Sequence, residues 1–499
     1  MNNVYSLLRE RALQSPDKTA FIANGQGISF SELLDLSIKG AKYIQSHIGA
    51  SSIIMIIVDR SIYVPLCFFS SAISGCTYVP ISEQLPEKRI LEIQEYLHPG
   101  IVINTSSTLL FPGSVSAREV FHSAPGIYQE TFRPSIDVFA PLYIAFTSGS
   151  TGIPKGVTVA QHGVMDYIQT ISELFGITHN DSLATIASFD FDTTIRDIYS
   201  TIYVGCTTHI LPSKVSCSPK ELIDYLNNNK ITTLFSWSAT ALSIPVQTNA
   251  IKLLRNDYLK QVFFSGSVLS SRVLRNWQEH LPNTKFYNMY GPTECTGTST
   301  YYYIDHIVEE GEMLYIGCPL PNKKIILLKP LSDTPVADGE IGEICIGGMG
   351  VSLGYYNDKY ETSRSFIQNP LNNSYNETIY RTGDLGRLDP EKNMIEFHGR
   401  MDRQVKVFGY RVELDEIEFH ANQIREIDCC AVLYDDSLSV IIFFYEAKSE
   451  LSKQIALRLR GELPSYMIPR RFIKMERIPR NLHQKVDYKQ LLKFYESTK

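Results

Sequence analysis

The sequence predicts an α/β protein that ends in a smaller α+β domain, and three observations support this fold class. In about the first 340 residues, short apolar runs alternate with amphipathic helical patterns, as they do in parallel sheets with helical crossovers. From about Gly339 onward, apolar runs follow one another with fewer helical patterns between them, which predicts a β-rich subdomain. The final hundred residues read as a helix, two strands and another helix.

These patterns predict two domains. A chain of 499 residues is long for a single hydrophobic core. We expect a large N-terminal domain, residues 1–401, with mixed or parallel sheets flanked by helices and the β-rich subdomain. A small, mobile C-terminal α+β domain would follow, residues 402–499, with the boundary near "GRMDRQ".

Individual elements can be predicted in chain order. The apolar runs at 19–23, 53–58, 99–104 and 141–148 read as strands. The segments 29–48 and 218–229 read as helices, and each opens with a serine that can cap the first turn. In the last hundred residues, the predicted elements are a helix at 413–424, strands at 429–435 and 438–446, and a helix from about Ser452.

Composition points to an ordinary cytoplasmic protein. The net charge of −6, without a long basic run, gives no reason to expect nucleic acid as a partner. The first twenty residues carry charges where a signal peptide needs an apolar core, and the apolar runs are too short to span a membrane. Nine scattered cysteines without a C-x-x-C pair argue against disulfides and structural zinc, so we expect small core residues.

The segment "TSGSTGIPKG", residues 147–156, predicts a phosphate-binding loop. It follows the apolar run "LYIAF" and combines hydroxyl side chains with three glycines, which leave backbone N–H groups free to face a polyphosphate. It is not a Walker loop, because Lys155 is followed by Gly156 instead of a serine or threonine. Composition alone would equally allow a flexible turn.

Further motifs decide between these two interpretations. "YNMYGPTE" (287–294), "YRTGD" (380–384), "GRMDRQVKVFGYRVELDEIE" (399–418) and "HQKVD" (483–487) follow the loop in that order. With them, nearly the whole chain resembles the adenylate-forming ligase superfamily, and most closely the amino-acid adenylation domains of nonribosomal peptide synthesis. The resemblance implies activation of a carboxylate by ATP as an acyl-adenylate, with release of pyrophosphate, and transfer of the acyl group to a thiol.

The resemblance also implies roles for motif residues. Glu294 corresponds to the family's magnesium ligand, and its neighbour Thr293 would contact the α-phosphate. Asp384 would accept hydrogen bonds from the ribose hydroxyls, supported by Arg400. The implied ATP-binding residues are Thr147, Ser148, Gly149, Ser150, Thr151, Gly152, Lys155, Asn288, Tyr290, Asp384, Arg400 and Lys485.

The small domain would carry the catalytic lysine, Lys485. An ammonium between the attacking carboxylate and the phosphates offsets the repulsion between two anions. The family pattern has glycine where this chain has Gln484, which puts the rate of the reaction in doubt more than the role of the lysine. Asp402 corresponds to the hinge about which the small domain rotates between the two half-reactions, and Gly409 and Arg411 would then face the active site.

Substrate choice is implied to lie with a further set of residues. Asp192, which spacing favours over Asp190, would pair with the α-ammonium of an amino acid, whereas acyl-CoA ligases lack such an aspartate. The implied pocket comprises Asp192, Thr193, Arg196, Phe235, Phe263, Ser265, Met289, Gly297 and Thr298, closed by Lys485. Arg196 could bind an acidic substrate side chain, or it could pair with Asp192 or another protein carboxylate. A small neutral amino acid remains an equal alternative.

The acceptor thiol is expected on another protein. No carrier domain follows "HQKVD", so we expect ATP, Mg²⁺ and a phosphopantetheine thiol on a separate carrier protein. Three alternatives remain open: a D-alanine:carrier-protein ligase, an acyl-CoA ligase, and a nucleotide- or partner-binding protein with weak turnover. A hydrolase is a remote fourth, since "GVSLG" (350–354) fits the G-x-S-x-G pattern but is followed by a turn-like segment.

Overall fold

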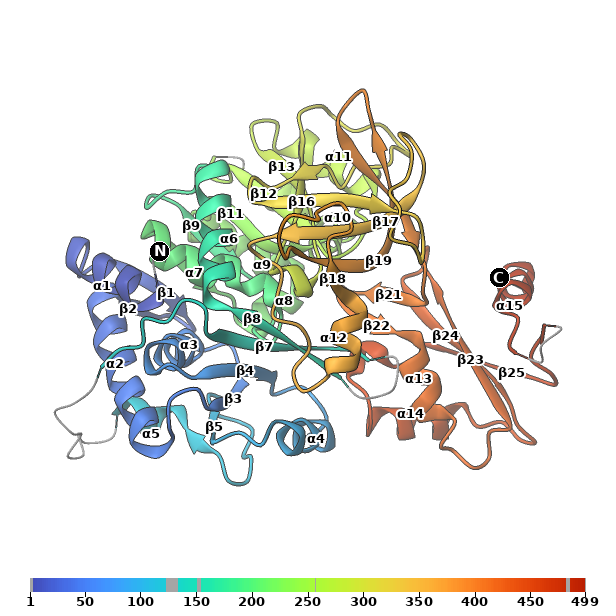
Figure 1. Ribbon diagram of the computed structural model, residues 1–499, viewed down its shortest axis with the longest axis horizontal. Helices are drawn as coiled ribbons and strands as arrows, with labels where there is room; N and C mark the ends of the chain where they lie inside the picture. Colours follow the sequence, from blue (N-terminus) through green and yellow to red (C-terminus); the bar gives the residue numbers. More distant parts are fainter. Residues whose placement is uncertain (1–2, 123–132, 150–153, 256, 482–484, 499) are drawn as a thin grey trace. The chain divides into compact units, whose positions relative to one another are not determined.

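The computed structural model describes residues 3–122, 133–149, 154–255, 257–481 and 485–498. The chain divides into two compact units. The large unit comprises residues 1–83, 98–145 and 156–401, and the small unit comprises residues 84–97, 146–155 and 402–499. The fold is a mixed α/β arrangement, as the sequence predicted, and the described residues form five separate sheets (Figure 1).

A nine-stranded sheet forms the centre of the large unit. Its order is β15-β14-β13-β12-β11-β9-β10-β1-β2, and β13, β12, β11, β9, β10 and β1 run parallel. The strands are β1 (Thr19–Ala23), β2 (Gln26–Ser29), β9 (Ser182–Thr185), β10 (Thr207–Ile210), β11 (Thr233–Ser238), β12 (Gln261–Ser265), β13 (Lys285–Tyr290), β14 (Thr300–Ile304) and β15 (Cys318–Pro319). The parallel order follows from the helical crossovers between successive strands.

A second, six-stranded sheet has the order β6-β5-β3-β4-β7-β8. Its strands are β3 (Ile53–Val58), β4 (Thr77–Ser82), β5 (Ile101–Asn104), β6 (Val115–Ser116), β7 (Pro141–Thr147) and β8 (Lys155–Ala160). One continuous core joins both sheets through helices packed between them. Those helices are α1 (Val4–Gln14), α2 (Phe30–His47), α3 (Tyr63–Ser74), α5 (Ala117–His122), α6 (Gln161–Leu174) and α7 (Ile195–Val204).

A second core lies under the remaining helices of the nine-stranded sheet. Both tryptophans are buried in it, and their indole N–H groups donate to the carbonyls of Ala184 (2.8 Å from Trp237) and Leu242 (2.9 Å from Trp277). The helices are α8 (Ser213–Cys217), α9 (Pro219–Asn228), α10 (Ala239–Gln247) and α11 (Ser271–His280), with short 3₁₀ turns η1 (Asp192–Thr194), η2 (Ala250–Leu253) and η3 (Thr293–Cys295).

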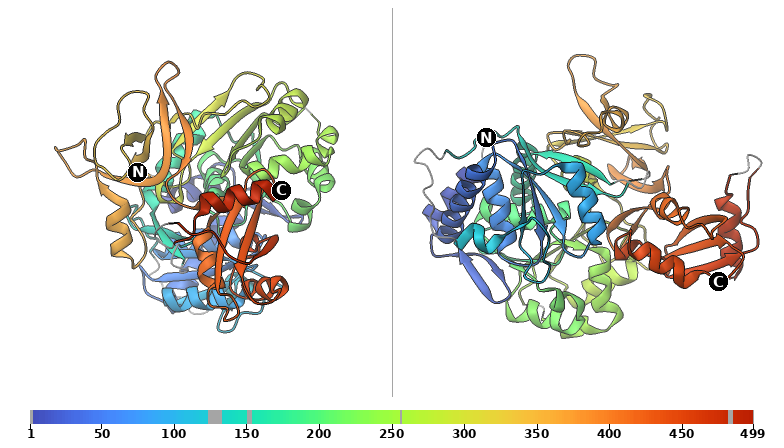
Figure 2. Two further views of the ribbon diagram at one scale, coloured as in Figure 1. Left: turned by 90° about the vertical axis from the view of Figure 1, so that its right-hand side faces the viewer. Right: turned by 90° about the horizontal axis from the view of Figure 1, so that it is seen from below.

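The β-rich subdomain is a five-stranded antiparallel sheet of the large unit (Figure 2). It begins earlier than predicted, at Lys323, because β16 pairs along its whole length with β17. Its elements are β16 (Lys323–Leu328), β17 (Gly342–Gly348), α12 (Lys359–Ser365), β18 (Phe366–Gln368), β19 (Thr378–Asp389) and β20 (Met394–Arg400). No helix follows β17 until Lys359, so the segment "GVSLG" lacks the helix that a nucleophile elbow requires.

The small unit has an α+β core of its own. It contains the predicted helix and two strands, together with a hairpin and a third strand that pairs parallel with β24. Its elements are α4 (Glu87–Leu97), β21 (Gln404–Val407), β22 (Tyr410–Glu413), α13 (Leu414–Ala421), β23 (Cys429–Asp435), β24 (Val440–Glu446), α14 (Ser452–Arg460), η4 (Ser465–Met467), β25 (Arg471–Met475) and α15 (Tyr488–Thr498).

Local predictions agree closely with these elements. Ser29 and Ser218 accept hydrogen bonds from the first turns of α2 and α9, as the capping pattern indicated. Six of the nine cysteines are buried, which fits their expected role in the core, but Cys217 is exposed.

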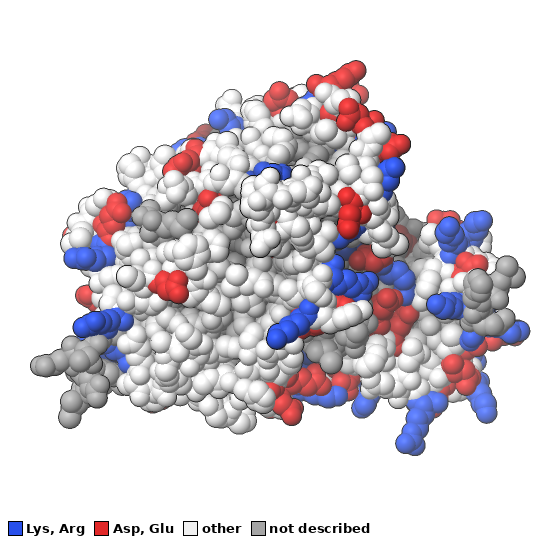
Figure 3. All heavy atoms as spheres, viewed as in Figure 1, with Lys and Arg blue, Asp and Glu red and all other residues white. Residues whose placement is uncertain are grey.

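None of the helices in the described residues combines the length and apolar character needed to cross a membrane. On the face in Figure 3, basic and acidic side chains are interspersed.

Candidate functional site

The residues expected to bind the substrate gather at one edge of the nine-stranded sheet. The neighbouring strands β9, β11, β12 and β13 run parallel, so their carboxyl ends lie at the same edge. Asp192 and Thr193 follow β9 in η1, and Ser265 ends β12. Phe235 lies within β11 and Met289 near the end of β13. The topology therefore collects residues that are far apart in sequence.

An apolar wall is formed by aromatic rings of adjacent strands. The ring centroid of Phe263 lies 4.7 Å from that of Phe235 and 4.6 Å from that of Tyr287. Both phenylalanines are fully buried, and Met289 is also buried beside them. The stacking of Phe263 on Tyr287 follows from the sheet, because the two residues are paired in register on the neighbouring parallel strands β12 and β13.

Arg196, on α7, is fully buried against this wall. Its Nη2 donates to Ser265 Oγ at 3.0 Å, and its Nε donates to the Thr193 carbonyl at 3.4 Å. The guanidinium carbon lies 5.9 Å from the centre of the Phe235 ring. Nη1 has no hydrogen-bond partner, and among the described residues Arg196 forms no ion pair with a carboxylate. The pairing with Asp192, one of the two alternatives that the sequence allowed for Arg196, is therefore absent from this structure.

The charges of Asp192 and Arg196 both affect the pKa of Tyr167. Burial raises the pKa of Tyr167, while the charge of Arg196 lowers it and the charge of Asp192 raises it. Burial, followed by the charge of Asp192, also holds the pKa of Tyr143 well above its usual value. Asp190 has a different environment: burial raises its pKa, and its charged neighbour is Arg60. The two aspartates that competed in the sequence therefore face different surroundings.

Tyr167 also closes against the turn that follows η3. Its hydroxyl and Thr298 Oγ1 share a hydrogen bond of 2.7 Å. Gly297 has a positive φ of 73°, and a Cβ there would lie 2.6 Å from the Tyr167 ring. Only glycine fits this position without a shift of the ring. Tyr167 could not be identified from the sequence, because its partner Thr298 lies 131 residues further along the chain.

The carboxylate of Glu294 is buried in the large unit. Its Oε1 accepts a hydrogen bond from the Tyr355 hydroxyl at 2.8 Å, and its carbonyl accepts one from the Ser352 N–H at 2.9 Å. Magnesium is usually held by one or two carboxylates together with substrate phosphates, so this single carboxylate fits such a role. The described residues contain no cluster of three or more His, Cys, Asp or Glu that would form an all-protein metal site. Thr293, beside Glu294, is half-buried.

The predicted nucleoside residues meet across two sheets of the large unit. Tyr290 donates its hydroxyl to Asp384 Oδ2 at 2.5 Å, and Arg400 forms an ion pair with Oδ1. Asp384 is buried, and its carboxylate still has lone pairs to accept further hydrogen bonds. Asn288 donates to the Tyr315 carbonyl at 2.8 Å. The link between Tyr290 and Asp384 was not visible in the sequence.

The described part of the phosphate loop lies in the small unit. Thr147 Oγ1 donates to the Lys155 carbonyl at 3.4 Å, and Ser148 Oγ donates to the Arg411 carbonyl at 2.9 Å. The Gly149 N–H donates to Glu416 Oε2 at 3.2 Å. A carboxylate thus accepts from one of the N–H groups that we expected to face a phosphate. Ser150, Thr151 and Gly152 lie outside the described residues.

Glu416 is itself fully buried on α13. Its other oxygen, Oε1, forms an ion pair with Arg89 of α4, within the same unit. Burial raises the pKa of Glu416 to about 7, even though Arg89 and the Gly149 N–H favour its charged form. The sequence did not indicate this residue, although it belongs to the "DEIE" end of a recognised motif.

Lys485 lies just before α15 in the small unit. Its side chain is exposed, and its backbone exchanges two hydrogen bonds with Asn481 (2.8 and 3.2 Å). Gln484 lies outside the described residues. Asp402 is exposed, and its carboxylate accepts a hydrogen bond from the Gln404 N–H at 3.2 Å. Gly409 has a positive φ of 89° in the hairpin turn that precedes Arg411.

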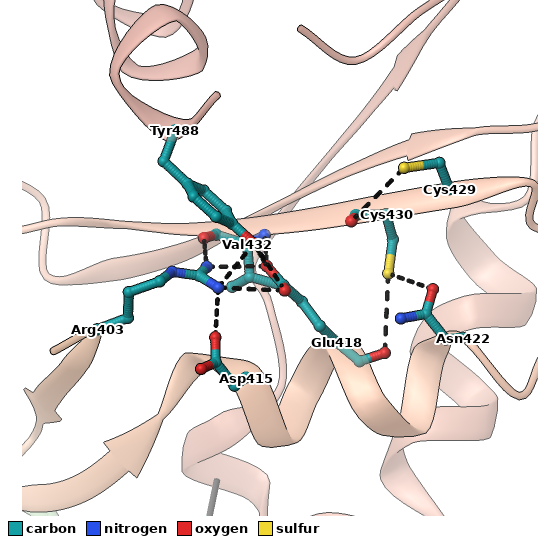
Figure 4. Close-up of polar contacts among 8 residues, drawn as sticks. All are labelled: Arg403, Asp415, Glu418, Asn422, Cys429, Cys430, Val432 and Tyr488. Atoms are coloured by element: carbon teal, nitrogen blue, oxygen red, sulfur yellow. Dashed lines mark hydrogen bonds and ion pairs between the residues drawn. The ribbon is translucent and has the colours of Figure 1, made fainter. Parts of the chain in front are cut away.

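Arg403, beside Asp402, ties three elements of the small unit together (Figure 4). It forms ion pairs with Asp415 and Glu418 of α13, and it donates to the Val432 carbonyl of β23 at 2.6 Å. It also donates to the Tyr488 hydroxyl at 2.8 Å and lies 3.7 Å from the centre of that ring. Tyr488 begins α15, so this network fixes the element that directly follows Lys485.

The chain matches one family model and several known proteins. The family model described as AMP-binding enzyme matches residues 8–356. Zwittermicin A synthase ZmaJ of Bacillus cereus is 30% identical over 98% of this chain and 94% of its own length. A D-alanine--D-alanyl carrier protein ligase of Bacillus licheniformis is 29% identical over 97% of this chain and 98% of its own length.

Other relatives are much longer than this chain. Bacitracin synthase 1 of Bacillus licheniformis is 31% identical over 98% of this chain, which spans only 9% of that protein. Among solved structures, an artificially fused adenylation–PCP di-domain from Klebsiella oxytoca has a TM-score of 0.84 at 23% identity, covering 100% of this chain and 97% of that chain. The Vibrio cholerae adenylation domain AlmE, in complex with glycyl-adenosine-5'-phosphate, has a TM-score of 0.82 at 21% identity and covers 100% and 98%.

Proposed function

Because the chain belongs to the family of AMP-binding enzymes, we propose that it is an ATP-dependent, AMP-forming ligase that activates an amino acid and loads it onto a carrier protein. In the first half-reaction, the substrate carboxylate attacks the α-phosphorus of ATP. The bond to the pyrophosphate group breaks, which gives aminoacyl-AMP and pyrophosphate. In the second, a thiolate attacks the acyl carbon, and AMP leaves.

The observation that carries the choice of an amino acid is Asp192. It stands at the carboxyl edge of the parallel strands, and its charge acts on Tyr143 and Tyr167. A carboxylate there can bind the α-ammonium of the substrate and hold the α-carboxylate for reaction, because correct orientation lowers the barrier to attack. An acyl-CoA ligase with a plain carboxylic acid has no use for a negative charge at this position.

The large unit supplies further roles in this proposal. Asp384 accepts from the ribose hydroxyls while Arg400 and Tyr290 hold its carboxylate in place. Asn288 is set beside Tyr290 to contact the adenine. Glu294 would hold a magnesium ion, which would offset the charge of the phosphates, and Thr293 would contact the α-phosphate.

The small unit supplies the phosphate loop and the lysine. Loop residues bind the β- and γ-phosphates: Thr147, Ser148, Gly149, Ser150, Thr151, Gly152 and Lys155. Lys485 places its ammonium between the two reacting anions. The thiol is the phosphopantetheine of a carrier protein. The carrier-protein ligase of similar length among the relatives supports this partner.

That relative also favours a second candidate function, in which the substrate is D-alanine. Its similarity extends over 97% of this chain, which is the observation in its favour. One assay separates the two candidates: exchange of labelled pyrophosphate into ATP, driven by each proteinogenic amino acid, by D-alanine and by simple carboxylic acids. Exchange with one L-amino acid supports the first candidate, and exchange with D-alanine alone supports the second. Exchange only with a plain carboxylic acid would contradict both.

A further inference from the structure

Arg196 is a buried positive charge that the described protein does not neutralise by an ion pair. The side chain is fully buried, Nη1 has no hydrogen-bond partner, and none of the ion pairs of the described residues includes it. A guanidinium stays protonated in proteins, so burial cannot be relieved by loss of its charge. A charge removed from water without a counter-ion is strongly unfavourable. We therefore expect an anion to bind to the guanidinium of Arg196.

We propose that Arg196 determines specificity by binding an anionic side chain of the amino acid substrate. This inference rests on the proposed function, because it assigns the three charged groups of one substrate. The α-ammonium faces Asp192, and the α-carboxylate must remain available to react with ATP. The side chain is then the part of the substrate that can reach a guanidinium on the same wall. An amino acid of the aspartate or glutamate type supplies the missing carboxylate.

The contacts around Arg196 hold its guanidinium in the position that this role needs. Ser265 Oγ accepts from Nη2 at the end of β12, and the Thr193 carbonyl accepts from Nε. The ring of Phe235 lies 5.9 Å from the guanidinium carbon and packs against Phe263, and all three side chains are fully buried. In such a buried site a charge-assisted hydrogen bond to a carboxylate is stronger than in water. Two of the three guanidinium nitrogens, Nε and Nη2, donate to the protein, and Nη1 has no protein acceptor, so it is available to the substrate.

Asp197 is the protein carboxylate that could compete for this role. It is adjacent in sequence and fully buried, and its charge interacts with that of Arg196. However, it forms no ion pair with Arg196 in this structure, and its oxygens lack partners with good hydrogen-bond geometry, although the Ser236 and Thr185 hydroxyls are near enough to lower its pKa. Burial raises the pKa of Asp197 to about 6, so near neutral pH Asp197 is mostly charged and offsets part of the charge of Arg196. That compensation does not satisfy Nη1.

The test compares each acid with its uncharged amide in pyrophosphate exchange by the full-length protein. Aspartate, asparagine, glutamate and glutamine are assayed in both stereochemical forms, with alanine and leucine as neutral references. We expect one acidic amino acid to exceed its amide by about 100-fold in kcat/KM, the size of effect produced by an unpaired buried charge. If a neutral amino acid is preferred and no acid exceeds its amide, the inference is wrong while the proposed function stands. If no amino acid drives exchange, the proposed function itself fails.

Variants locate the effect at Arg196. Arg196→Gln should bring the acid-to-amide ratio close to one, mainly through a higher KM for the acid, while Arg196→Lys should retain a preference for the acid. Ser265→Ala, which removes the hydroxyl that holds Nη2, should lower the ratio less than Arg196→Gln. A ratio that is unchanged in folded Arg196→Gln would overturn the assignment. If that variant does not fold, the ratios of Ser265→Ala and Arg196→Lys against the unmodified protein decide the question.

Discussion

At the scale of single residues, the site depends on polar side chains whose partners come from distant parts of the chain. The motif "YRTGD" predicted an aspartate for the ribose, and Asp384 is buried with Arg400 against it. The hydroxyl of Tyr290, 94 residues earlier, also binds this carboxylate. Motifs can identify such residues because their order along the chain is visible. Pairings between motifs depend on the packing of two sheets, which local sequence does not encode.

Asp192 gives the first prediction at this scale. Asp192→Ala should raise the KM for the amino acid by about 100-fold, because removing one partner of a buried ion pair costs roughly 3 kcal/mol or more. The KM for ATP should change little. Asp190→Ala is the matched control. It should leave the KM for the amino acid nearly unchanged, because the charged neighbour of Asp190 is Arg60. Steady-state exchange kinetics measure both KM values. If Asp190→Ala raises the KM for the amino acid and Asp192→Ala does not, Asp190 binds the α-ammonium instead.

Gly297 gives the second residue-scale prediction. In Gly297→Ala, the new side chain must adopt a positive φ of 73°, and its Cβ would lie 2.6 Å from the Tyr167 ring. We therefore expect the free energy of unfolding to fall by about 2–3 kcal/mol. Gly311→Ala is the control, because it has a similar φ of 83° but no atom within 4 Å of the added Cβ. It should cost only about 1 kcal/mol. Urea unfolding followed by tryptophan fluorescence measures both, and equal losses would show that the contact with Tyr167 is unimportant.

At the scale of elements, local signals predicted well where neighbouring residues decide the structure. The run at 19–23 became β1, and serine caps marked the starts of α2 and α9. The prediction was wrong where pairing is long-range. Strand β16 was missed because its partner, β17, begins 19 residues after Lys323 and no tight-turn signal joins them. The contact of α13 with the phosphate loop through Glu416 was missed for the same reason.

The contact between α13, α4 and the loop predicts a dependence of stability on pH. The pKa of Glu416 is about 7, above its ordinary value of 4.5, so the folded protein keeps this proton where the unfolded chain has lost it. Stability therefore falls as pH rises from about 4.5 to 7, by at most ~3 kcal/mol, and is level above that range. In Glu416→Gln this part of the decrease should disappear.

Urea unfolding at pH 5, 6, 7 and 8, followed by circular dichroism, measures the effect. Asp197→Asn is the parallel case in the large unit, because burial raises the pKa of Asp197 to about 6 and its share of the decrease should end near that pH. A Glu416→Gln protein with the same slope as the unmodified protein between pH 5 and 7 would show that Glu416 ionises normally. The Asp197→Asn result reveals whether buried carboxylates elsewhere account for the slope.

At the scale of the whole molecule, the pattern of apolar runs and helical segments predicted both the large α/β part with its β-rich sheet and the α+β part that follows. The compact units differ from the predicted domains in one respect. Residues 84–97 and 146–155, which were predicted to belong to the large domain, group with residues 402–499. A linear sequence gives no sign of this grouping. It arises because Arg89 and Gly149 both contact Glu416. The phosphate loop and Lys485 therefore belong to the same compact unit, whereas Asp192 and Asp384 belong to the other.

The proposed role of Lys485 in the chemical step gives the last prediction. Lys485→Ala should reduce aminoacyl-AMP formation by at least about 100-fold, since the repulsion between the carboxylate and the phosphates is no longer offset. ATP should still bind, because Asp384, Arg400 and Glu294 are unchanged. Lys489→Ala, an exposed lysine four residues later on α15, is the control and should keep full activity. Pyrophosphate exchange measures the chemistry and isothermal titration with ATP measures binding. Loss of binding together with exchange would make Lys485 a nucleotide-binding residue, and full exchange in Lys485→Ala would remove it from the mechanism.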